Sequence, residues 1–381
     1  MTMVMKKIAI ITWIGNGNYG TCLQAFALHY KVKDMGYDTY ILPSLSDFSK
    51  KKYVIKGYVK ILFKSLGISF LIKKIKSLYI PLNIIKLKKF QSKYINIVEI
   101  NTSGEKENFF GKIDVFIAGS DQICNTYYCF NPFFFLDFVK SKKKIAYASS
   151  IGTDSVNKIY AEKVKDLLFR FSHIGVREQT AVDVLSSLTG RDDIVQVSDP
   201  TFLLTKYDWL KVTEDAVFEF QLPEKYIFCY FIATKDIYFK QISDIKKRTG
   251  INKIIMVPSK ESESFDVCNI SDCFLYKNAG PSEFVRLIEK SELVCTDSFH
   301  ATALSIILSK DFVDFYRFDN GEKESQNSRI NNLLEHYNLK NRIYSVDSDE
   351  WRLPIDYDKV NKVLNSDKVF SEDYLRNAIE R

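Results

Sequence analysis

The sequence predicts an α/β protein built from two Rossmann-like halves. Short, almost continuous apolar segments alternate with helical patterns, and such segments are typical of parallel strands covered on both faces. Several of these strands end in polar residues, at the edge where open parallel sheets bind ligands. A second series of strands and helices follows residues 205–225. We therefore expect two halves that face each other across a cleft.

The composition agrees with a globular protein of two domains. The chain has 381 residues, of which 46% are hydrophobic and 27% charged, so it can bury a sizeable core. Its seven cysteines are scattered without zinc-finger spacing, and we expect reduced thiols and no metal site. The N-terminal segment lacks the order of a signal peptide, and no apolar stretch is long enough to span a membrane. These features predict a cytoplasmic protein.

Residues 1–210 are expected to form the N-terminal domain. Strand 7–13, a glycine-rich loop, a helix that stops at Gly36 and strand 37–42 make a βαβ unit. The later strands of this domain share an apolar run with a polar ending. They are residues 113–118, 144–148, 174–176 and 194–197.

The glycine-rich loop at residues 15–20 matches the G-x-G-x-x-G pattern of dinucleotide-binding proteins. That pattern needs an acidic residue at the end of the second strand, to bind a ribose hydroxyl. Here the strand ends in Tyr40, Ile41, Leu42 and Pro43. The sequence therefore favours a loop that lets some other polar ligand approach closely over a nicotinamide or flavin site.

A basic insert occupies about residues 48–98. It contains thirteen lysines and no acidic residue, and Pro81 divides it into two expected helices. One interpretation is an amphipathic insertion whose lysines face water. The other is a surface from Lys50 to Lys93 that contacts an anionic membrane carrying a lipid-linked glycan. No motif for nucleic-acid binding accompanies the charge, so a nucleic-acid partner is not expected.

Residues 211–345 are expected to form the C-terminal domain. Residues 259–279 are predicted to be irregular, and the tail 346–381 is predicted to form two helical pieces that pack back on the N-terminal domain. The domain itself repeats the alternation of strands with helices. Its strands are residues 226–232, 253–257, 293–296 and 310–316, and its helices are residues 237–248, 281–290 and 328–336.

The strongest functional signal is a strand, turn and helix at residues 292–307. The turn presents Ser298 and His300 in the first turn of the helix. A helix N-terminus attracts anions, and a histidine there can transfer protons near neutral pH. The structural alternative is that Asp297 or Ser298 caps the helix and His300 packs beneath it.

Two arginines are candidate anion-binding groups. Arg177 directly follows a strand and Arg329 lies at the start of a helix. A guanidinium group is suited to hold a carboxylate or a phosphate. For Arg177 the alternative is an ion pair with Glu178 or another neighbouring acid. The other histidines, His29, His173 and His336, are expected to have surface or packing roles.

Seven segments together resemble the polysaccharide pyruvyl transferase family, across roughly residues 7–340. The resemblance implies a GT-B-like fold with the active site between two Rossmann-like domains. It implies transfer of pyruvate from phosphoenolpyruvate to saccharide hydroxyls, usually as a ketal, in the synthesis of cell-surface polysaccharides. Phosphoenolpyruvate is then a co-substrate, and no cofactor or metal is expected. The segments are GNYGTCLQAFAL, DVFIAGSDQICN, IAYASSIG, IGVRE, VSDPTFLL, TDSFHATALSI and SRINNLL.

The resemblance also implies residue roles. His300 matches the catalytic histidine of the family, and Arg177 matches the arginine of its Arg-Glu motif. Ser298 stands where well-studied ketal-forming members have an arginine, so Arg329 becomes a candidate to supply the missing phosphate contact. The expected donor-binding residues are Thr296, Asp297, Ser298 and Arg329. The expected acceptor-binding residues are Asn18, Tyr19, Gly20, Gln24, Ser120, Asp121, Gln122 and Ser150.

Two other functions are open at this point. One is a GT-B-type glycosyltransferase that uses a nucleotide sugar and binds its diphosphate at the same helix N-terminus. The other is a non-catalytic protein that binds glycans or membranes through the basic insert. The polar strand endings favour an enzyme over the second alternative.

Overall fold

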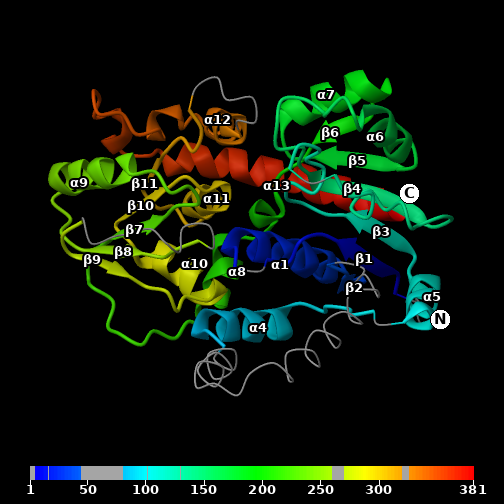
Figure 1. The fold of residues 1–381 in the computed structure, drawn as a ribbon, viewed down its shortest axis with the longest axis horizontal. Helices are drawn as coiled ribbons and strands as arrows, with labels where there is room; N and C mark the ends of the chain where they lie inside the picture. The colour runs from blue at the N-terminus through cyan, green and yellow to red at the C-terminus, as the bar shows by residue number, and fades with distance from the viewer. Residues whose placement is uncertain are drawn as a thin grey trace, which may run out of the picture.

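A computed structural model describes residues 5–15, 17–43, 80–100, 102–128, 130–259, 270–319 and 326–381. Two parallel sheets lie side by side, each covered by helices (Figure 1). The first helix expected in the basic insert falls outside the described residues. These two units are called the N-terminal half and the C-terminal half below.

The sheet of the N-terminal half has the strand order β2-β1-β3-β4-β5-β6, and all its pairs are parallel. Four of the five residues of β1 are buried, which explains its continuous apolar sequence. The strands are β1 (Lys7–Ile11), β2 (Asp38–Ile41), β3 (Val115–Ala118), β4 (Lys143–Ser149), β5 (His173–Val176) and β6 (Ile194–Gln196).

The helices of the N-terminal half connect these strands. The Asn18 side chain caps α1 by accepting a hydrogen bond of 3.2 Å from the Thr21 N–H. After β6 the chain makes a 3-10 helix, Pro200–Leu203, whose preceding residue Asp199 caps it. The helices are α1 (Tyr19–Asp34), α5 (Ser103–Lys112), α6 (Ala161–Leu168) and α7 (Gln179–Thr189).

The sheet of the C-terminal half has the order β11-β10-β7-β8-β9, again all parallel. Strand β9 (Cys273–Leu275) lies in the region predicted to be irregular, and that prediction was wrong. A three-residue edge strand without a fully buried residue has no continuous apolar pattern to reveal it. The other strands are β7 (Ile227–Tyr230), β8 (Ile254–Met256), β10 (Leu293–Thr296) and β11 (Phe312–Asp314).

The described residues of the C-terminal half form five helices. Helix α11 follows β10 through the two-residue turn that carries the strongest functional signal of the sequence. The helices are α8 (Lys206–Thr213), α9 (Ile237–Thr249), α10 (Pro281–Lys290), α11 (Phe299–Ile307) and α12 (Asn327–His336).

Helix α13 (Tyr357–Glu380) crosses from the C-terminal half to the N-terminal half (Figure 1). Two helical pieces were predicted for the tail, but the structure has one continuous helix after a short 3-10 turn. Near its start, the Tyr357 hydroxyl donates to the Lys310 carbonyl. At its end, Glu380 forms an ion pair of 2.6 Å with Lys6. Between them Tyr374 packs so closely on Gly175 of β5 that a Cβ there would lie 2.8 Å from its ring.

Helix α4 (Leu82–Tyr94) is the described part of the basic insert and contacts both halves. Lys86 lies 2.7 Å from Glu219 and 3.4 Å from Glu283, and Lys93 lies 2.5 Å from Asp215. These two lysines therefore pair with acids of the C-terminal side and do not simply face water. Among the described residues, no helix is both long enough and apolar enough to cross a membrane.

One hydrophobic core extends through both halves. It includes Leu23 and Phe26 from α1, Trp209 from α8 and Phe284 from α10. The Tyr19 ring stacks on Phe284 with centroids 4.8 Å apart, and its hydroxyl donates to the Ala279 carbonyl at 3.1 Å. The two halves are thus packed together along α1.

Candidate active site between the two halves

The turn between β10 and α11 is fixed from beneath by two buried side chains. The Asp297 carboxylate accepts hydrogen bonds from the Ile232 N–H at 2.6 Å and the Ala233 N–H at 2.9 Å. The Thr296 hydroxyl donates to the Tyr230 carbonyl at 2.6 Å. Burial raises the pKa of Asp297. Both side chains hold the end of β7, so the structure gives them a supporting role and does not place them in the cavity described below.

Ser298 occupies the N-cap position of α11, but its side chain makes no capping hydrogen bond. Its own N–H donates to the Thr296 hydroxyl at 3.0 Å, which fixes the direction in which the helix begins. The first N–H groups of α11 therefore lack a side-chain cap, and such groups attract anions.

His300 lies in the first turn of α11 and is 7% exposed. Its ring packs directly on Gly20 of α1, because a Cβ at Gly20 would lie only 2.4 Å from Nδ1. On the other side, Nε2 lies 3.5 Å from Oδ2 of Asp199. The histidine is therefore clamped between a glycine and a carboxylate of the N-terminal half.

Asp199 is the centre of a buried polar network. Its Oδ2 accepts hydrogen bonds of 3.0 Å from the Ser120 hydroxyl and from Nη1 of Arg177. Its Oδ1 accepts from the N–H and the hydroxyl of Thr201. Burial opposes the charged form, but His300 and Arg177 hold the pKa of Asp199 well below its usual range. Asp199 is therefore a carboxylate at neutral pH.

Arg177 lies at the end of β5, where the sequence placed a candidate anion-binding group. Its Nε donates to Glu178 at 2.9 Å, so the alternative of a neighbouring acidic partner is present in the structure, with Asp199 as a second one. The guanidinium carbon lies 4.2 Å from the centre of the Phe299 ring. Glu178 is held in turn by the Ser150 hydroxyl at 2.8 Å.

Arg329 is buried without an acidic partner among the described residues. Its Nη2 donates to the Gln326 side chain at 2.6 Å, and no carboxylate of the described segments lies within ion-pair distance. Burial, together with the charges of Arg177 and Arg317, lowers the pKa of Arg329. A buried cation of this kind is expensive unless an anion joins it.

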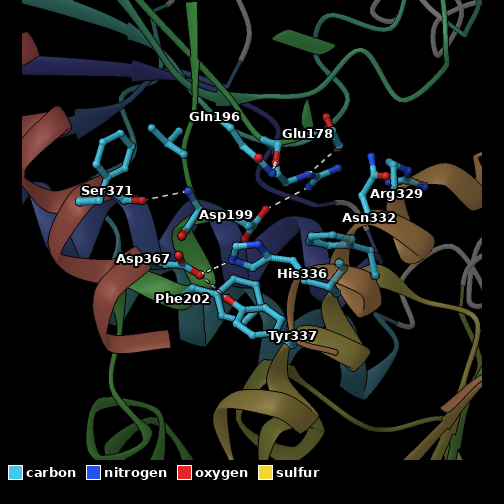
Figure 2. A pocket seen from close by; sticks show the side chains of 16 residues that line it. Glu178, Gln196, Asp199, Phe202, Arg329, Asn332, His336, Tyr337, Asp367 and Ser371 are labelled. Carbon is cyan, nitrogen blue, oxygen red and sulfur yellow. Dashed lines mark hydrogen bonds and ion pairs between the residues drawn. The ribbon is translucent and has the colours of Figure 1, made fainter. Parts of the chain in front are cut away.

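Arg177, Glu178, Asp199 and Arg329 line a cavity of about 110 Å³ between the halves, whereas Ser298 and His300 are not among its lining residues. Figure 2 shows the pocket between Ser371 and Asp367 of α13 at the left and Arg329 and Asn332 of α12 at the right, with Gln196 and Glu178 from the ends of β6 and β5 above. The lining residues that carry charge or can form hydrogen bonds are Arg177, Glu178, Gln196, Ser198, Asp199, Arg329, Asn332, His336, Tyr337, Asp367 and Ser371.

Buried polar atoms without a hydrogen-bond partner gather around this cavity. Among the described residues they include Nη2 of Arg177, Oε2 of Glu178, Nε2 of His300 and Nε of Arg329. Such atoms are rare in folded proteins and call for an explanation. A bound ligand with anionic and hydroxyl groups would satisfy them. Within the same described segments, no group of three or more potential metal ligands is placed to hold an ion.

The structure separates the expected acceptor residues into two groups. Ser120, Asp121, Gln122 and Ser150 lie at the ends of β3 and β4, and Gln122 reaches Gln326 of the C-terminal half at 3.0 Å. Gly20 lies near this group, because it packs on the His300 ring, which lies beside Asp199, the hydrogen-bond partner of Ser120.

The other three residues have structural partners. Asn18 caps α1, and Tyr19 packs between the halves. The Gln24 amide is completely buried and donates to the Thr12 hydroxyl and the Trp13 carbonyl. These contacts give the loop GNYGTCLQ a role in folding and in the placement of His300. None of the eight expected acceptor residues lines the cavity itself.

Sequence reasoning missed several lining residues. His336 was assigned to the surface or to packing, yet its Nε2 lies 2.6 Å from Asp367 of α13, which raises the pKa of His336. Asp199 follows a strand directly, and that signal was available from the sequence. Asp367 could not be found in this way, because only the path of α13 brings it to the cavity.

A family model of polysaccharide pyruvyl transferases matches residues 18–317. The chain belongs to the polysaccharide pyruvyl transferase family. It is therefore a transferase, and membership implies a saccharide acceptor. A sequence search among curated proteins found no significant match.

Solved structures resemble the chain in fold. A putative UDP-N-acetylglucosamine 2-epimerase from Listeria monocytogenes aligns with a TM-score of 0.51 and 10% identity, over 98% of this chain and 91% of the epimerase. The UDP-N-acetylglucosamine 2-epimerase of Methanocaldococcus jannaschii aligns with a TM-score of 0.49 and 13% identity, over 94% and 93%. The heptosyltransferase WaaC of E. coli aligns with a TM-score of 0.40 and 8% identity, over 87% of this chain and 98% of the heptosyltransferase. The alignment with the Listeria epimerase, together with the two parallel sheets, agrees with the GT-B-like fold expected for the pyruvyl transferase.

Proposed function

We propose that this protein transfers a pyruvyl group from phosphoenolpyruvate to two hydroxyls of a saccharide, forming a ketal, in the synthesis of a cell-surface polysaccharide. The observation that carries the proposal is the buried arginine pair beside the uncapped start of α11. Arg329 has no acidic partner in the described structure, and Nη2 of Arg177 has no hydrogen-bond partner there. Phosphoenolpyruvate carries both a phosphate and a carboxylate, which match such groups.

The size of the cavity supports a small donor. About 110 Å³ suits a three-carbon phosphate ester, whereas pockets for larger organic ligands are typically about 300–1,000 Å³. Ser298 stands where an arginine would supply a phosphate contact, and Arg329 offers a guanidinium group from α12 instead. In this proposal Arg329 holds the phosphate and Arg177 the carboxylate, with the N–H groups of α11 assisting.

The reaction needs one proton at carbon and two nucleophilic hydroxyls. Protonation of the methylene carbon makes a methyl group and leaves an oxocarbenium-like centre at the adjacent carbon. The first saccharide hydroxyl adds there and loses its proton. The carbon–oxygen bond to phosphate then breaks, the second hydroxyl adds, and its proton balances the hydrogen phosphate that leaves. One phosphate is released for each ketal formed.

His300 is assigned to proton transfer. It is fixed by Gly20 and by the ionised Asp199, and its Nε2 has no hydrogen-bond partner in the described structure. Ser120 and Arg177 keep the Asp199 carboxylate in place beside the imidazole. Proton transfer from a positioned histidine typically contributes about 10²–10⁴ in rate.

The acceptor in this proposal is linked to a lipid at the inner face of the membrane. The exposed lysines Lys88 and Lys89 on α4 support a contact with anionic headgroups. Lys86 and Lys93 form ion pairs with acidic residues, so we do not expect them to contact the headgroups.

The test is a calorimetric titration with phosphoenolpyruvate and, separately, with UDP-N-acetylglucosamine. The wild type should bind phosphoenolpyruvate, and Arg329→Gln should weaken that binding at least about tenfold. Arg352→Gln is the matched control, because Arg352 is an exposed arginine paired with Asp349. Binding of the nucleotide sugar without binding of phosphoenolpyruvate would favour a glycosyltransferase instead.

A further inference from the structure

We infer that three aromatic side chains at the carboxyl edge of the N-terminal sheet bind the saccharide acceptor. Trp13, Tyr127 and Tyr128 are called the aromatic platform below. The inference rests on the proposed function, which supplies the need for a saccharide, and it assigns the acceptor to residues outside the cavity.

The aromatic platform exposes large rings where a globular protein usually buries them. Tyr128 is 75% exposed and Tyr127 is 39% exposed. Trp13 is partly exposed and meets Tyr128 edge-on, with ring centroids 6.4 Å apart. Its other neighbour is the buried Phe134, at 5.6 Å. Trp13 thus joins the exposed rings to the core, and exposed apolar groups arranged in this way mark binding surfaces.

The loop that carries the tyrosines is held rigidly. The side-chain oxygen of Asn125 accepts hydrogen bonds of 3.0 Å from the N–H groups of both Tyr127 and Tyr128. The Tyr127 hydroxyl lies 2.9 Å from the Ser155 hydroxyl, so it is tied to the loop after β4. A surface that is ordered before its ligand arrives loses little entropy on binding.

A chain of side-chain amides connects the platform to the proposed donor site. Asn125 donates to Gln122 at 2.9 Å, and Gln122 donates to Gln326 at 3.0 Å. Gln326 accepts from Arg329 at 2.6 Å. If the Gln122 amide is turned over, its oxygen lies 3.2 Å from Nη1 of Arg329, so that Gln122 contacts the arginine directly. A saccharide on the platform would therefore be linked to the donor-binding arginine through Asn125, Gln122 and Gln326.

The chemistry of the platform fits a pyranose ring. The C–H faces of a sugar pack on aromatic rings, and its hydroxyls can pair with the exposed hydroxyls of Tyr127 and Ser155. The rings and their hydrogen-bond partners are uncharged, which argues against an anionic polymer such as a nucleic acid. The position is also the edge at which parallel sheets bind ligands.

The fluorescence of Trp13 can report ligand binding at the aromatic platform. The two other tryptophans, Trp209 and Trp351, are 0% and 1% exposed, so a soluble ligand on the platform should change the fluorescence of Trp13. The probes are methyl glycosides of hexoses and N-acetylhexosamines. We expect a saturable change with at least one probe. Tyr128→Ala should weaken binding about tenfold, whereas Tyr128→Phe should bind nearly as well as the wild type because the ring is retained.

The matched control is Tyr207→Ala, which removes a tyrosine that is 66% exposed on α8 and should leave glycoside binding unchanged. Phosphoenolpyruvate binding should survive in Tyr128→Ala, and thermal melting should show that the variant is folded. Glycoside binding in a wild type that ignores phosphoenolpyruvate would defeat the proposed donor but support the platform. No fluorescence response to any glycoside, or unchanged binding by Tyr128→Ala, would overturn the inference.

Discussion

At the scale of single residues, Gly20 shows why a glycine stands in a helix. A helix interior normally favours alanine over glycine by up to about 1 kcal/mol, but the His300 ring occupies the space of a Cβ at this position. The His300 side chain of the other half thus explains the last glycine of the G-x-G-x-x-G pattern, Gly20. A bound nucleotide is not needed to account for this glycine.

We predict that Gly20→Ala loses activity and some stability, because the new methyl group would overlap the buried His300 side chain. The imidazole would have to leave its place between Gly20 and Asp199, and a displacement of about 1 Å at a reacting group can reduce the rate about a hundredfold. The measurement is phosphate release from phosphoenolpyruvate in the presence of a glycoside acceptor. Gly104→Ala is the control, since a Cβ at Gly104 of α5 meets nothing within 4 Å. A fully active Gly20→Ala would argue against this placement of His300.

Arg329 gives a second prediction at this scale. The substitution Arg329→Gln removes a buried cation that has no acidic partner in the described structure, so the free energy of unfolding should stay equal or rise. Added inorganic phosphate should raise the melting temperature of the wild type but hardly that of the variant. A variant that is clearly less stable, yet still stabilised by phosphate, would show that Arg329 has a structural role only.

At the scale of elements, the sequence predicts those elements whose pattern is local. The strands with continuous apolar runs and the turn before α11 were found because their signal lies within a few residues. Strand β9 and the continuous α13 were missed, since burial of their faces depends on segments distant in sequence. Arg177 was found from its position after a strand, whereas its contact with Asp199 depends on how β5 and β6 are paired.

Helix α1 also carries a buried histidine that links it to neighbouring elements. Nε2 of His29 lies 3.2 Å from the Thr39 carbonyl in β2 and 3.2 Å from the Asn96 N–H after α4. Burial lowers the pKa of His29 to about 4. Between that value and the ordinary pKa of about 6.5, the unfolded chain binds a proton that the folded protein does not.

The stability of the wild type should therefore fall as the pH is lowered from about 6.5 toward 4. His29 would contribute up to about 1.4 kcal/mol per pH unit to this loss. We predict a shallower decline for His29→Gln, measured by urea unfolding at several pH values. Equal slopes for the two proteins would mean that folding does not lower the pKa of His29.

At the scale of the whole molecule, α13 and the shared core make the two halves one cooperative unit. Leu375, Ala378 and Ile379 near the end of α13 are at most 1% exposed, and they belong to the same core as residues of the C-terminal half. We expect one thermal unfolding transition, and a loss of about 2–5 kcal/mol in Leu375→Ala without a second transition. Two separate transitions in calorimetry would show that the halves unfold independently.

The most direct test of the account is the fate of phosphoenolpyruvate and a saccharide incubated with the enzyme. Mass spectrometry of the glycoside and assay of free phosphate should show a pyruvyl ketal and one phosphate for each ketal. The variant His300→Ala should bind phosphoenolpyruvate as the wild type does but react at least about a hundredfold more slowly. Transfer at the wild-type rate by His300→Ala, or a glycoside that gains a sugar from a nucleotide sugar and no pyruvate, would contradict the account.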